Sequence, residues 1–367
     1  VGGGLAGLIS SILLSRSGYD VVLIEKKKYP FHKVCGEYIS NEVKGFLKQH
    51  DLFPHHLEPS SINRFRLSSI TGKAACIDLN LGGFGISRYT LDHFLVSEAK
   101  EAGVIVMEET TVDNIKYERS HNDHFNIILS SGKELLAKFV IGAYGKRSKI
   151  DKQLNRSFIQ KRSPYIGVKY HIRFDHPDNE VALHNFKGGY CGLNKVDGGL
   201  SNLCYLSTRE NLRRHGQIRA MEEAVLCQNP ELKAIFSNAK FVFDQPEVIN
   251  EISFETKGPV DHHILMCGDA AGMITPLCGN GMAMAIHSAK VVYETLHEGF
   301  KYNLNRAEIE ILYSKRWRSL FASRLSIGRQ LQKLFGSGAL SNFSVGIINN
   351  IKPLARFLVE KTHGKPF

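Results

Sequence analysis

The spacing of apolar residues changes along this chain, and its first part follows the succession of strands and helices typical of a parallel sheet. Apolar positions in residues 5–14 recur with helical spacing, and residues 21–25 read as an apolar strand. A second helix is predicted for residues 87–102, and a strand for residues 104–107. Helices that alternate with short apolar strands indicate an α/β fold.

The turn before the first helix carries a glycine motif, Val1-Gly-Gly-Gly-Leu-Ala-Gly7. It matches the dinucleotide-binding fingerprint, in which Gly2 allows a tight turn, Gly4 lets the backbone approach a pyrophosphate, and Gly7 lets the helix pack closely on the strand. Glu25, at the end of the next strand, is placed to accept hydrogen bonds from ribose hydroxyls. An ordinary glycine loop is the alternative, but the surrounding helix, strand and acid favour a bound dinucleotide.

The chain begins on this turn and contains only Val1 of the strand that leads into it. In a parallel sheet that strand is central and buried, so its absence would leave neighbouring backbone groups without partners. We therefore expect that upstream residues have been lost or left out. Whether that upstream segment contains a signal peptide or an anchor is left open by the sequence.

The middle of the chain changes to a period of two, which is typical of strands with one buried face. The alternation indicates an antiparallel sheet that covers the site, with one helical stretch at residues 218–227. Besides the strand at 104–107, the strands predicted after residue 60 lie within 61–86 and at 111–117, 126–129, 139–145, 165–174, 181–185, 189–196 and 202–207.

A second glycine-rich block, Cys267-Gly-Asp-Ala-Ala-Gly-Met-Ile-Thr-Pro-Leu-Cys-Gly-Asn-Gly281, precedes a predicted helix at residues 282–297. With the first motif, it resembles the flavoprotein superfamily that includes p-hydroxybenzoate hydroxylase and the geranylgeranyl reductases, over nearly the whole chain. The resemblance implies bound FAD, with Gly268 and Asp269 at the ribityl chain. The helix N-terminus would face the flavin pyrimidine ring, where it stabilises the negative charge that reduction produces.

Motif and resemblance together imply a set of cofactor-binding residues. For two of them a simpler role is the alternative: Asp269 as a helix cap or Asx-turn residue, and Arg88 as a solvated surface residue. The set is Gly2, Gly4, Leu5, Ala6, Gly7, Glu25, Lys26, Arg88, Val112, Gly145, Gly268, Asp269, Pro276, Gly279, Asn280, Gly281 and Met282.

One departure from the family concerns the electron donor. Hydroxylases of this superfamily carry an Asp-Gly motif that is held to contact both FAD and the nicotinamide donor. The matching stretch here is Gly142-Ala-Tyr-Gly-Lys-Arg-Ser148, in which Tyr144 stands where Asp is expected, while Gly145 and Ser148 fit. The expected donor is therefore either NADPH or a separate electron-carrying protein.

The loop Lys33-Val-Cys-Gly-Glu37 resembles the Lys-x-Cys-Gly element of geranylgeranyl reductases, in which the cysteine lies close to the flavin. Cys35 is therefore the candidate catalytic residue, because a thiol there can relay a proton to a substrate carbon. A small apolar filler of the loop is the alternative. Tyr190 and Asn202 match loosely a substrate-side motif of the reductases. That motif contains a Trp, which is missing from the matching stretch, because the only Trp here is Trp317. The same fact disfavours halogenation, since flavin-dependent halogenases need a Trp-x-Trp-x-Ile-Pro element.

The net charge of +11 is unevenly placed, with six basic residues and no acid between Lys315 and Phe335. Apolar residues recur at near-helical spacing in the same segment, so this helix can lie on a membrane or dock on an acidic partner. A surface helix packed onto its own protein is the alternative. Nucleic acid is not expected, because the basic residues are not interleaved with an aromatic platform.

The seven cysteines are odd in number and never form a C-x-x-C pair, which favours reduced thiols in a cytoplasmic protein. No metal site is expected, because the adjacent side chains of His55-His56 and of His262-His263 diverge. No run of about eighteen consecutive apolar residues occurs, so any membrane association would be peripheral.

We therefore predict an α/β protein with a Rossmann-type FAD-binding domain around a central parallel sheet, an antiparallel-sheet substrate domain, and C-terminal helices. The first hypothesis for function is reduction of carbon–carbon double bonds in a long hydrophobic, polyprenyl or polyene-like substrate. An FAD-dependent monooxygenase acting on an aromatic or polyene is the alternative, and a flavin-holding chain that binds an acidic partner or a membrane is the third. The predicted domains are 1–60, 87–158 and 256–300 for FAD, 61–86 and 159–255 for the substrate sheet, and 301–367 for the helical region.

Overall fold

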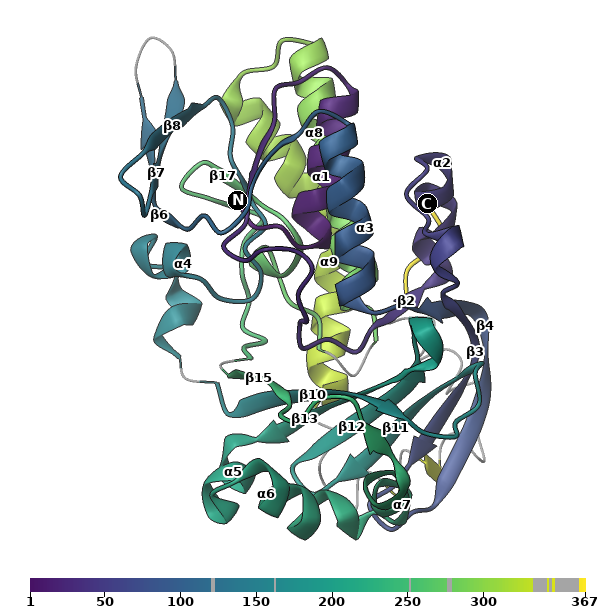
Figure 1. Ribbon diagram of the computed structural model, residues 1–367. Helices are drawn as coiled ribbons and strands as arrows, with labels where there is room; N and C mark the ends of the chain where they lie inside the picture. Colours follow the sequence, from purple (N-terminus) through teal and green to yellow (C-terminus); the bar gives the residue numbers. More distant parts are fainter. Residues whose placement is uncertain are drawn as a thin grey trace.

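The computed structural model of the protein describes residues 1–119, 123–161, 163–250, 252–275, 279–332, 342, 345–346 and 363–367. It has two stacked parts (Figure 1). In the first, helices α1 (Leu5–Arg16), α3 (Arg88–Glu101) and α8 (Gly281–Lys301) pack beside short strands. In the second, helices cover one face of a large sheet, and helix α9 (Arg306–Gln332) runs from one part to the other.

The parallel sheet of the first part consists of two short parallel pairs, β1 with β5 and β9 with β17, and β16 extends the second pair in an antiparallel sense. Val1 and Gly2 lie between the pairs: the Val1 carbonyl accepts the Ala143 N–H at 2.8 Å, and the Gly2 N–H donates to the Ile24 carbonyl at 2.8 Å. The strands are β1 (Val22–Ile24), β5 (Ile105–Met107), β9 (Ile141–Gly142), β16 (Val260–Asp261) and β17 (Ile264–Met266).

A separate three-stranded sheet, β6 (Val112–Glu118), β7 (His124–Leu129) and β8 (Glu134–Ala137), packs at the side of this part. The predicted hairpin at residues 111–129 is confirmed as β6 and β7. β8 was not predicted, because four residues are too few for alternation to be recognised.

The second part is built on a nine-stranded sheet in the order β14-β10-β13-β12-β11-β3-β4-β2, with β15 also paired to β10. All of its pairs are antiparallel except β3 with β11. The strands predicted after residue 160 and within 61–86 are confirmed here. The strands are β2 (Tyr38–Ser40), β3 (Ser60–Ser68), β4 (Ala74–Gly85), β10 (Tyr165–Arg173), β11 (Glu180–Phe186), β12 (Gly189–Lys195), β13 (Ser201–Thr208), β14 (Lys240–Phe241) and β15 (Glu247–Asn250).

Helices cover one face of this sheet and leave the other face toward the first part (Figure 1). In β10, Val168, Tyr170 and Ile172 belong to the apolar core under these helices. The alternate residues Lys169 and His171 therefore face the opposite way, as the strand period requires. The remaining helices are α2 (Lys44–Gln49), α4 (Lys149–Gln153), α5 (Arg209–His215), α6 (Ile218–Ala224) and α7 (Pro230–Asn238), of which α4, α5 and α7 were not predicted.

Helix α9 packs into the protein. The side chains of Trp317, Phe321 and Leu325 are buried, and burial of one such side chain contributes about 1.5–3 kcal/mol. Its basic residue Arg324 pairs with the buried Glu42, with 3.0 Å between Nη2 and Oε1. The apolar stripe predicted here thus packs onto the protein itself, and the last residues of the predicted segment lie outside the described ones. Among the helices that the structure describes, none is long and apolar enough to cross a membrane.

Candidate cofactor site

The two glycine-rich blocks meet in space because α1 and α8 pack side by side in the same direction. At one end, a Cβ added to Gly268 would lie 3.1 Å from the Ala6 Cβ and 3.6 Å from the Ala285 Cβ. At the other end, the hydroxyls of Ser17 and Tyr293 are 2.8 Å apart. The N-termini of both helices therefore point to one place, as the assignment of a single cofactor to both blocks requires.

The first block forms the tight turn that its glycines predict. Gly2 has φ +101°, and a Cβ on it would lie 2.5 Å from the Ala143 carbonyl oxygen. A Cβ on Gly7 would lie 1.9 Å from the Gly2 carbonyl oxygen, so only glycine allows this packing of helix on turn. Gly4 precedes α1 without a side-chain cap, and the first turn of the helix has no acid. Its N–H groups are thus available to a phosphate, while Leu5 and Ala6 are buried in α1.

The buried carboxylate of Glu25 lies directly on this turn. Its Oε2 accepts the Gly3 N–H at 2.8 Å, and its Oε1 accepts the Lys27 N–H at 3.0 Å. A carboxylate has further lone pairs, so it can also accept ribose hydroxyls at this position. Of the two neighbouring predictions, Lys26 is exposed, and Val112 is buried at the start of β6.

Two cations converge on the same turn. The Lys33 Nζ donates to the Gly3 carbonyl at 3.3 Å and to Asp92 at 2.8 Å. The Arg88 guanidinium donates twice to Asp92, at 2.8 Å in each case. Burial alone would raise the Asp92 pKa, but the charges of Arg88 and Lys33 outweigh it and lower that pKa. Two cations share one carboxylate, so one positive charge remains for a diphosphate.

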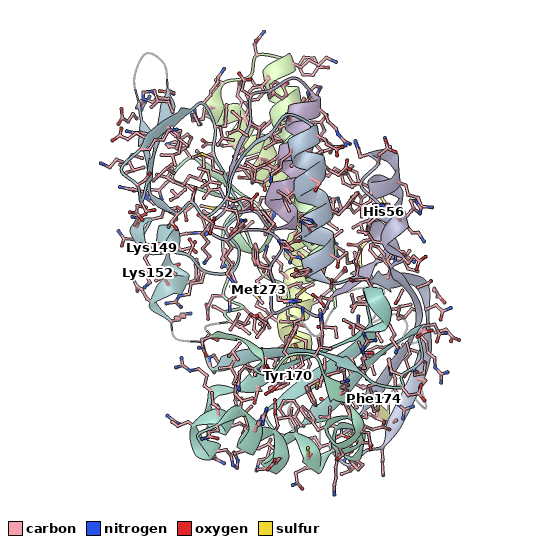
Figure 2. The ribbon with its side chains drawn as sticks, in the orientation of Figure 1. His56, Lys149, Lys152, Tyr170, Phe174 and Met273 are labelled. Atoms are coloured by element: carbon pink, nitrogen blue, oxygen red, sulfur yellow. The ribbon has the colours of Figure 1, made fainter. Side chains whose placement is uncertain are left out.

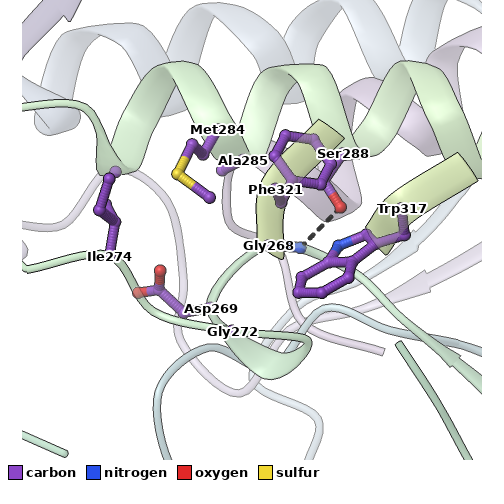
Figure 3. Close-up of a pocket in the computed structure, with 10 residues that line it drawn as sticks. Gly268, Asp269, Gly272, Ile274, Met284, Ala285, Ser288, Trp317 and Phe321 are labelled. Atoms are coloured by element: carbon purple, nitrogen blue, oxygen red, sulfur yellow. Dashed lines mark hydrogen bonds between the residues drawn. The ribbon is translucent and has the colours of Figure 1, made fainter. Parts of the chain in front are cut away.

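The second block places the unsatisfied carboxylate of Asp269 beside the first. Gly268 adopts φ +62°, and its N–H donates to the Ser288 hydroxyl at 3.2 Å, along one wall of a narrow pocket (Figure 3). Within the described residues the Asp269 carboxylate makes no hydrogen bond, and burial raises its pKa. A half-buried carboxylate without donors fits the hydroxyls of a ribityl chain, so the residues present fit FAD.

The start of α8 matches the expected position of a helix end that faces the ring. Gly279 has φ +62°, and Asn280 before Gly281 is buried without a side-chain cap bond to α8. Met282 is buried in the first turn, which has no acid. Pro276, also predicted to bind the cofactor, lies outside the described residues.

The position of the family's Asp-Gly motif holds no carboxylate. The Tyr144 hydroxyl donates to the Met266 Sδ at 3.1 Å, so the ring is turned toward β17. Gly145 has φ +81° and open space where a Cβ would be. The loop keeps its backbone turn but has Tyr144 in place of the family's carboxylate.

The Cys-Gly loop lies on the polar face of the large sheet. Burial raises the pKa of the Cys35 thiol. The Asn202 Nδ2 on β13 donates to the carbonyls of Cys35 at 3.2 Å and Gly36 at 2.9 Å. Asn202, predicted as a substrate contact, thus holds the candidate catalytic loop with its amide N–H groups.

The predicted substrate residue Tyr190 lies on the same sheet face, farther from the loop. It belongs to an apolar group, here called the sheet cluster, against which Met273 of the second glycine block packs. Met273 is labelled in Figure 2. The sheet cluster is Leu67, Ala75, Ile77, Leu183, Tyr190, Leu206, Ile252 and Val345.

A buried charged group next to the loop was missed by the sequence analysis. Glu37 is fully buried with φ +52°, and its carboxylate contacts the Lys169 Nζ at 2.5 Å and the His171 Nε2 at 2.7 Å. It also accepts the Arg88 N–H at 2.7 Å. The available signal was the pair of polar residues at 169 and 171 within an otherwise apolar strand, because polar groups buried there need a partner.

The histidine pairs lie in turns. His262 and His263 both adopt positive φ, and His55 begins a short 3-10 turn with His56. Among the described residues, no group of three His, Cys, Asp or Glu side chains could hold a metal ion.

Comparison with known proteins supports the cofactor site. The family model described as FAD binding domain matches residues 1–303. The chain is 23% identical to conditioned medium factor receptor 1 of Dictyostelium discoideum, over 89% of this chain and 68% of the receptor. It is 25% identical to digeranylgeranylglycerophospholipid reductase of Methanosarcina acetivorans, over 87% of this chain and 79% of that reductase.

Among solved structures, a geranylgeranyl bacteriochlorophyll reductase-like protein from Thermoplasma acidophilum has the same fold. Its TM-score is 0.77 at 19% identity, over 98% of this chain and 95% of the other. The chain therefore belongs to the FAD binding domain family and is an FAD-dependent oxidoreductase of the p-hydroxybenzoate hydroxylase superfamily, similar to the geranylgeranyl reductases.

Proposed function

We propose that this protein reduces carbon–carbon double bonds of a long hydrophobic, polyprenyl or polyene-like substrate. The observation that carries the proposal is the sheet cluster. It is an apolar group on the sheet face that looks toward the cofactor loops; its side chains are buried, and Met273 of the second glycine block packs against it. In the proposal a long apolar chain lies against this group in place of the side chains that cover it here, because that arrangement keeps apolar area out of water.

The apolar and polar parts of this sheet face are proposed to have different roles: one binds the substrate and the other supports the loop of Cys35. The register of β13 with β10 places Asn202 beside His171 and Leu206 beside Gly167, so the face grades from polar to apolar along the strands. The apolar part binds the substrate chain and excludes water. The polar part, with Asn202, holds the loop of Cys35 in a fixed position.

The proposed role of Cys35 is to hold and deliver a proton. Its raised pKa keeps the thiol protonated at neutral pH, as a general acid must be before it protonates a carbon. FAD supplies the hydride when it is bound. With Tyr144 in place of the family's Asp, we propose that electrons come from a separate electron-carrying protein, with NADPH as the other donor. Peripheral membrane contact stays a prediction.

Anaerobic mixing of the dithionite-reduced holoprotein with polyprenyl and polyene substrates tests the activity. The flavin absorbance should return to that of the oxidised form as the substrate gains two hydrogens, detected by mass spectrometry. Cys35→Ala should slow this step by about 10²–10⁴-fold, the usual contribution of a general acid, while FAD stays bound. Absence of reoxidation by every alkene tested would contradict the proposal.

A second arm in air separates the monooxygenase alternative. Stoichiometric O₂ consumption with hydroxylated product, and no saturated product under anaerobic conditions, would assign the protein to that class.

A further inference from the structure

Lys257 lies on the segment that returns from the large sheet to the cofactor-binding part, between β15 and β16. Its Nζ donates to the carbonyl of Asp269 at 2.9 Å and to that of Lys146 at 2.7 Å. The first carbonyl belongs to the Gly-Asp turn, and the second follows Gly145 in the loop that replaces the family's Asp-Gly motif. One ammonium group thus joins the two loops that border the cofactor site.

The Lys257 side chain is half-buried, and its ammonium has no carboxylate partner among the residues that the structure describes. Within the described residues its contacts are the two carbonyls and the Phe158 ring, whose centroid lies 4.2 Å from Nζ. Burial lowers the Lys257 pKa to about 8. The charges of Asp269 and Asp151 act against burial, and those of Arg156 and Lys146 act with it. Buried charges in proteins are normally paired, so this arrangement calls for a negative charge from a ligand.

A buried cation next to it provides the contrast. The Arg156 Nη1 donates to the Ala270 carbonyl at 2.9 Å, and the same guanidinium contacts Asp151 and Asp261, each at 2.9 Å. Arg156 and Lys257 therefore bind consecutive carbonyls of one turn. Among the described residues Arg156 forms ion pairs with two carboxylates and Lys257 with none, so Asp269 and Asp151 compensate the charge of Lys257 only at longer range.

We propose that Lys257 is a positioning residue for FAD, whose ammonium holds the Gly-Asp turn against the 144–146 loop and balances the negative charge that the cofactor brings. The neutral amine keeps two N–H donors but has no charge, so it holds the two carbonyls more weakly and balances no negative charge. FAD binding therefore favours the ammonium form, and linkage requires the affinity for FAD to fall as that form is lost.

Titration of the apoprotein with FAD, followed by flavin fluorescence across neutral and alkaline pH, tests this role. For the wild type, the affinity should begin to fall near pH 8, where Lys257 loses its proton. Lys257→Met should bind FAD about tenfold more weakly at neutral pH, as for loss of one charge-assisted hydrogen bond, and should lose the alkaline dependence. Lys257→Arg should retain tight binding above pH 8, because guanidinium stays charged.

The matched control is Lys161→Met. Lys161 is 67% exposed and pairs with Glu255 on the same return segment, so its loss should leave both the affinity and its pH dependence at wild-type values. Wild-type affinity with wild-type pH dependence in Lys257→Met would overturn the proposal. If Lys257→Met does not fold by circular dichroism, the Arg variant decides: a fall in its affinity near pH 8, like that of the wild type, overturns the role. No substrate is present, so the result is independent of the proposed reductase activity.

Discussion

Two buried glutamates lie against opposite faces of the large sheet, and neighbouring residues of β10 give them opposite properties. On the helical face, the Glu222 carboxylate of α6 accepts the hydroxyls of Tyr170 at 3.0 Å and Tyr205 at 2.7 Å. Burial raises its pKa to about 7, and the two hydrogen bonds offset only part of that effect. A carboxyl with neutral partners in a core therefore keeps its proton up to a higher pH than an exposed carboxyl does.

On the cofactor face, Glu37 has charged partners. Burial would raise its pKa as well, but the charge of Lys169 and the hydrogen bond of His171 outweigh burial and lower it. The difference shows how one strand serves two environments. Residues 168, 170 and 172 pack a core, while residues 169 and 171 support the loop that carries Cys35.

Removing the charge of Glu37 should have the largest effect on stability. Glu37→Gln leaves the Lys169 ammonium buried without its carboxylate, which costs about 3–5 kcal/mol in unfolding free energy, measured by urea denaturation at neutral pH. As a control, Glu255→Gln breaks the exposed pair with Lys161 and should cost about 0–1 kcal/mol. Equal losses in the two variants would refute the distinction between the buried and exposed pairs.

Truncating a core side chain on the helical face should lower the free energy of unfolding and leave the affinity for FAD unchanged. Leu203 is fully buried in the core under the helices, and Leu203→Ala should cost about 2–5 kcal/mol through lost burial and a cavity. The affinity for FAD at a temperature where the variant is folded should equal that of the wild type. A weakened FAD affinity would show that the two faces of the sheet are coupled.

The pH dependence of the free energy of unfolding should reveal the raised pKa of Glu222. Its folded pKa is raised from 4.5 to about 7, so the native state binds the extra proton. The stabilisation is complete below pH 4.5 and is lost as the pH rises through about 7. Relative to Glu222→Gln, the wild type should lose about 1–3 kcal/mol across this window. Parallel stability curves for the two proteins in urea titrations would contradict the raised pKa.

Asn202→Ala removes two hydrogen bonds to the Cys35 loop, and its effect on stability should be similar in size to that of the Glu222 proton. The loss should be about 1–3 kcal/mol, because two carbonyls lose their donor, and the Cys35 thiol should react faster with a thiol reagent as the loop opens. Cys204, two residues along the same strand, offers a comparison by its own reaction rate. An unchanged Cys35 rate would show that Asn202 does not hold the loop.

Much of the fold could be predicted because the patterns involved are local. The apolar helix of residues 5–14 and the two-residue alternation of 189–196 each depend only on neighbours along the chain, and both elements are present. Short elements such as β8 and α5 were missed because they contain too few residues for a period. The stripe of α9 was recognised, but whether it met a membrane, a partner or the protein itself depended on α8, which packs against it.

The candidate site divides in the same way. Gly2, Gly7 and Asp269 could be named because a tight turn and a phosphate or hydroxyl ligand restrict the residue types that fit. Glu37 and Lys257 could not, because their roles depend on partners more than a hundred residues away or on backbone carbonyls that carry no sequence signal.

By itself, the sequence determined the two glycine turns, the helices that follow them and the alternation of the sheet, since each rests on steric and hydrophobic rules that act within a few residues. The tertiary structure alone decided that α1 and α8 run in the same direction and bring those turns together. It also decided which buried charges find partners, because desolvation makes a charge depend on every group that surrounds it, however distant along the chain.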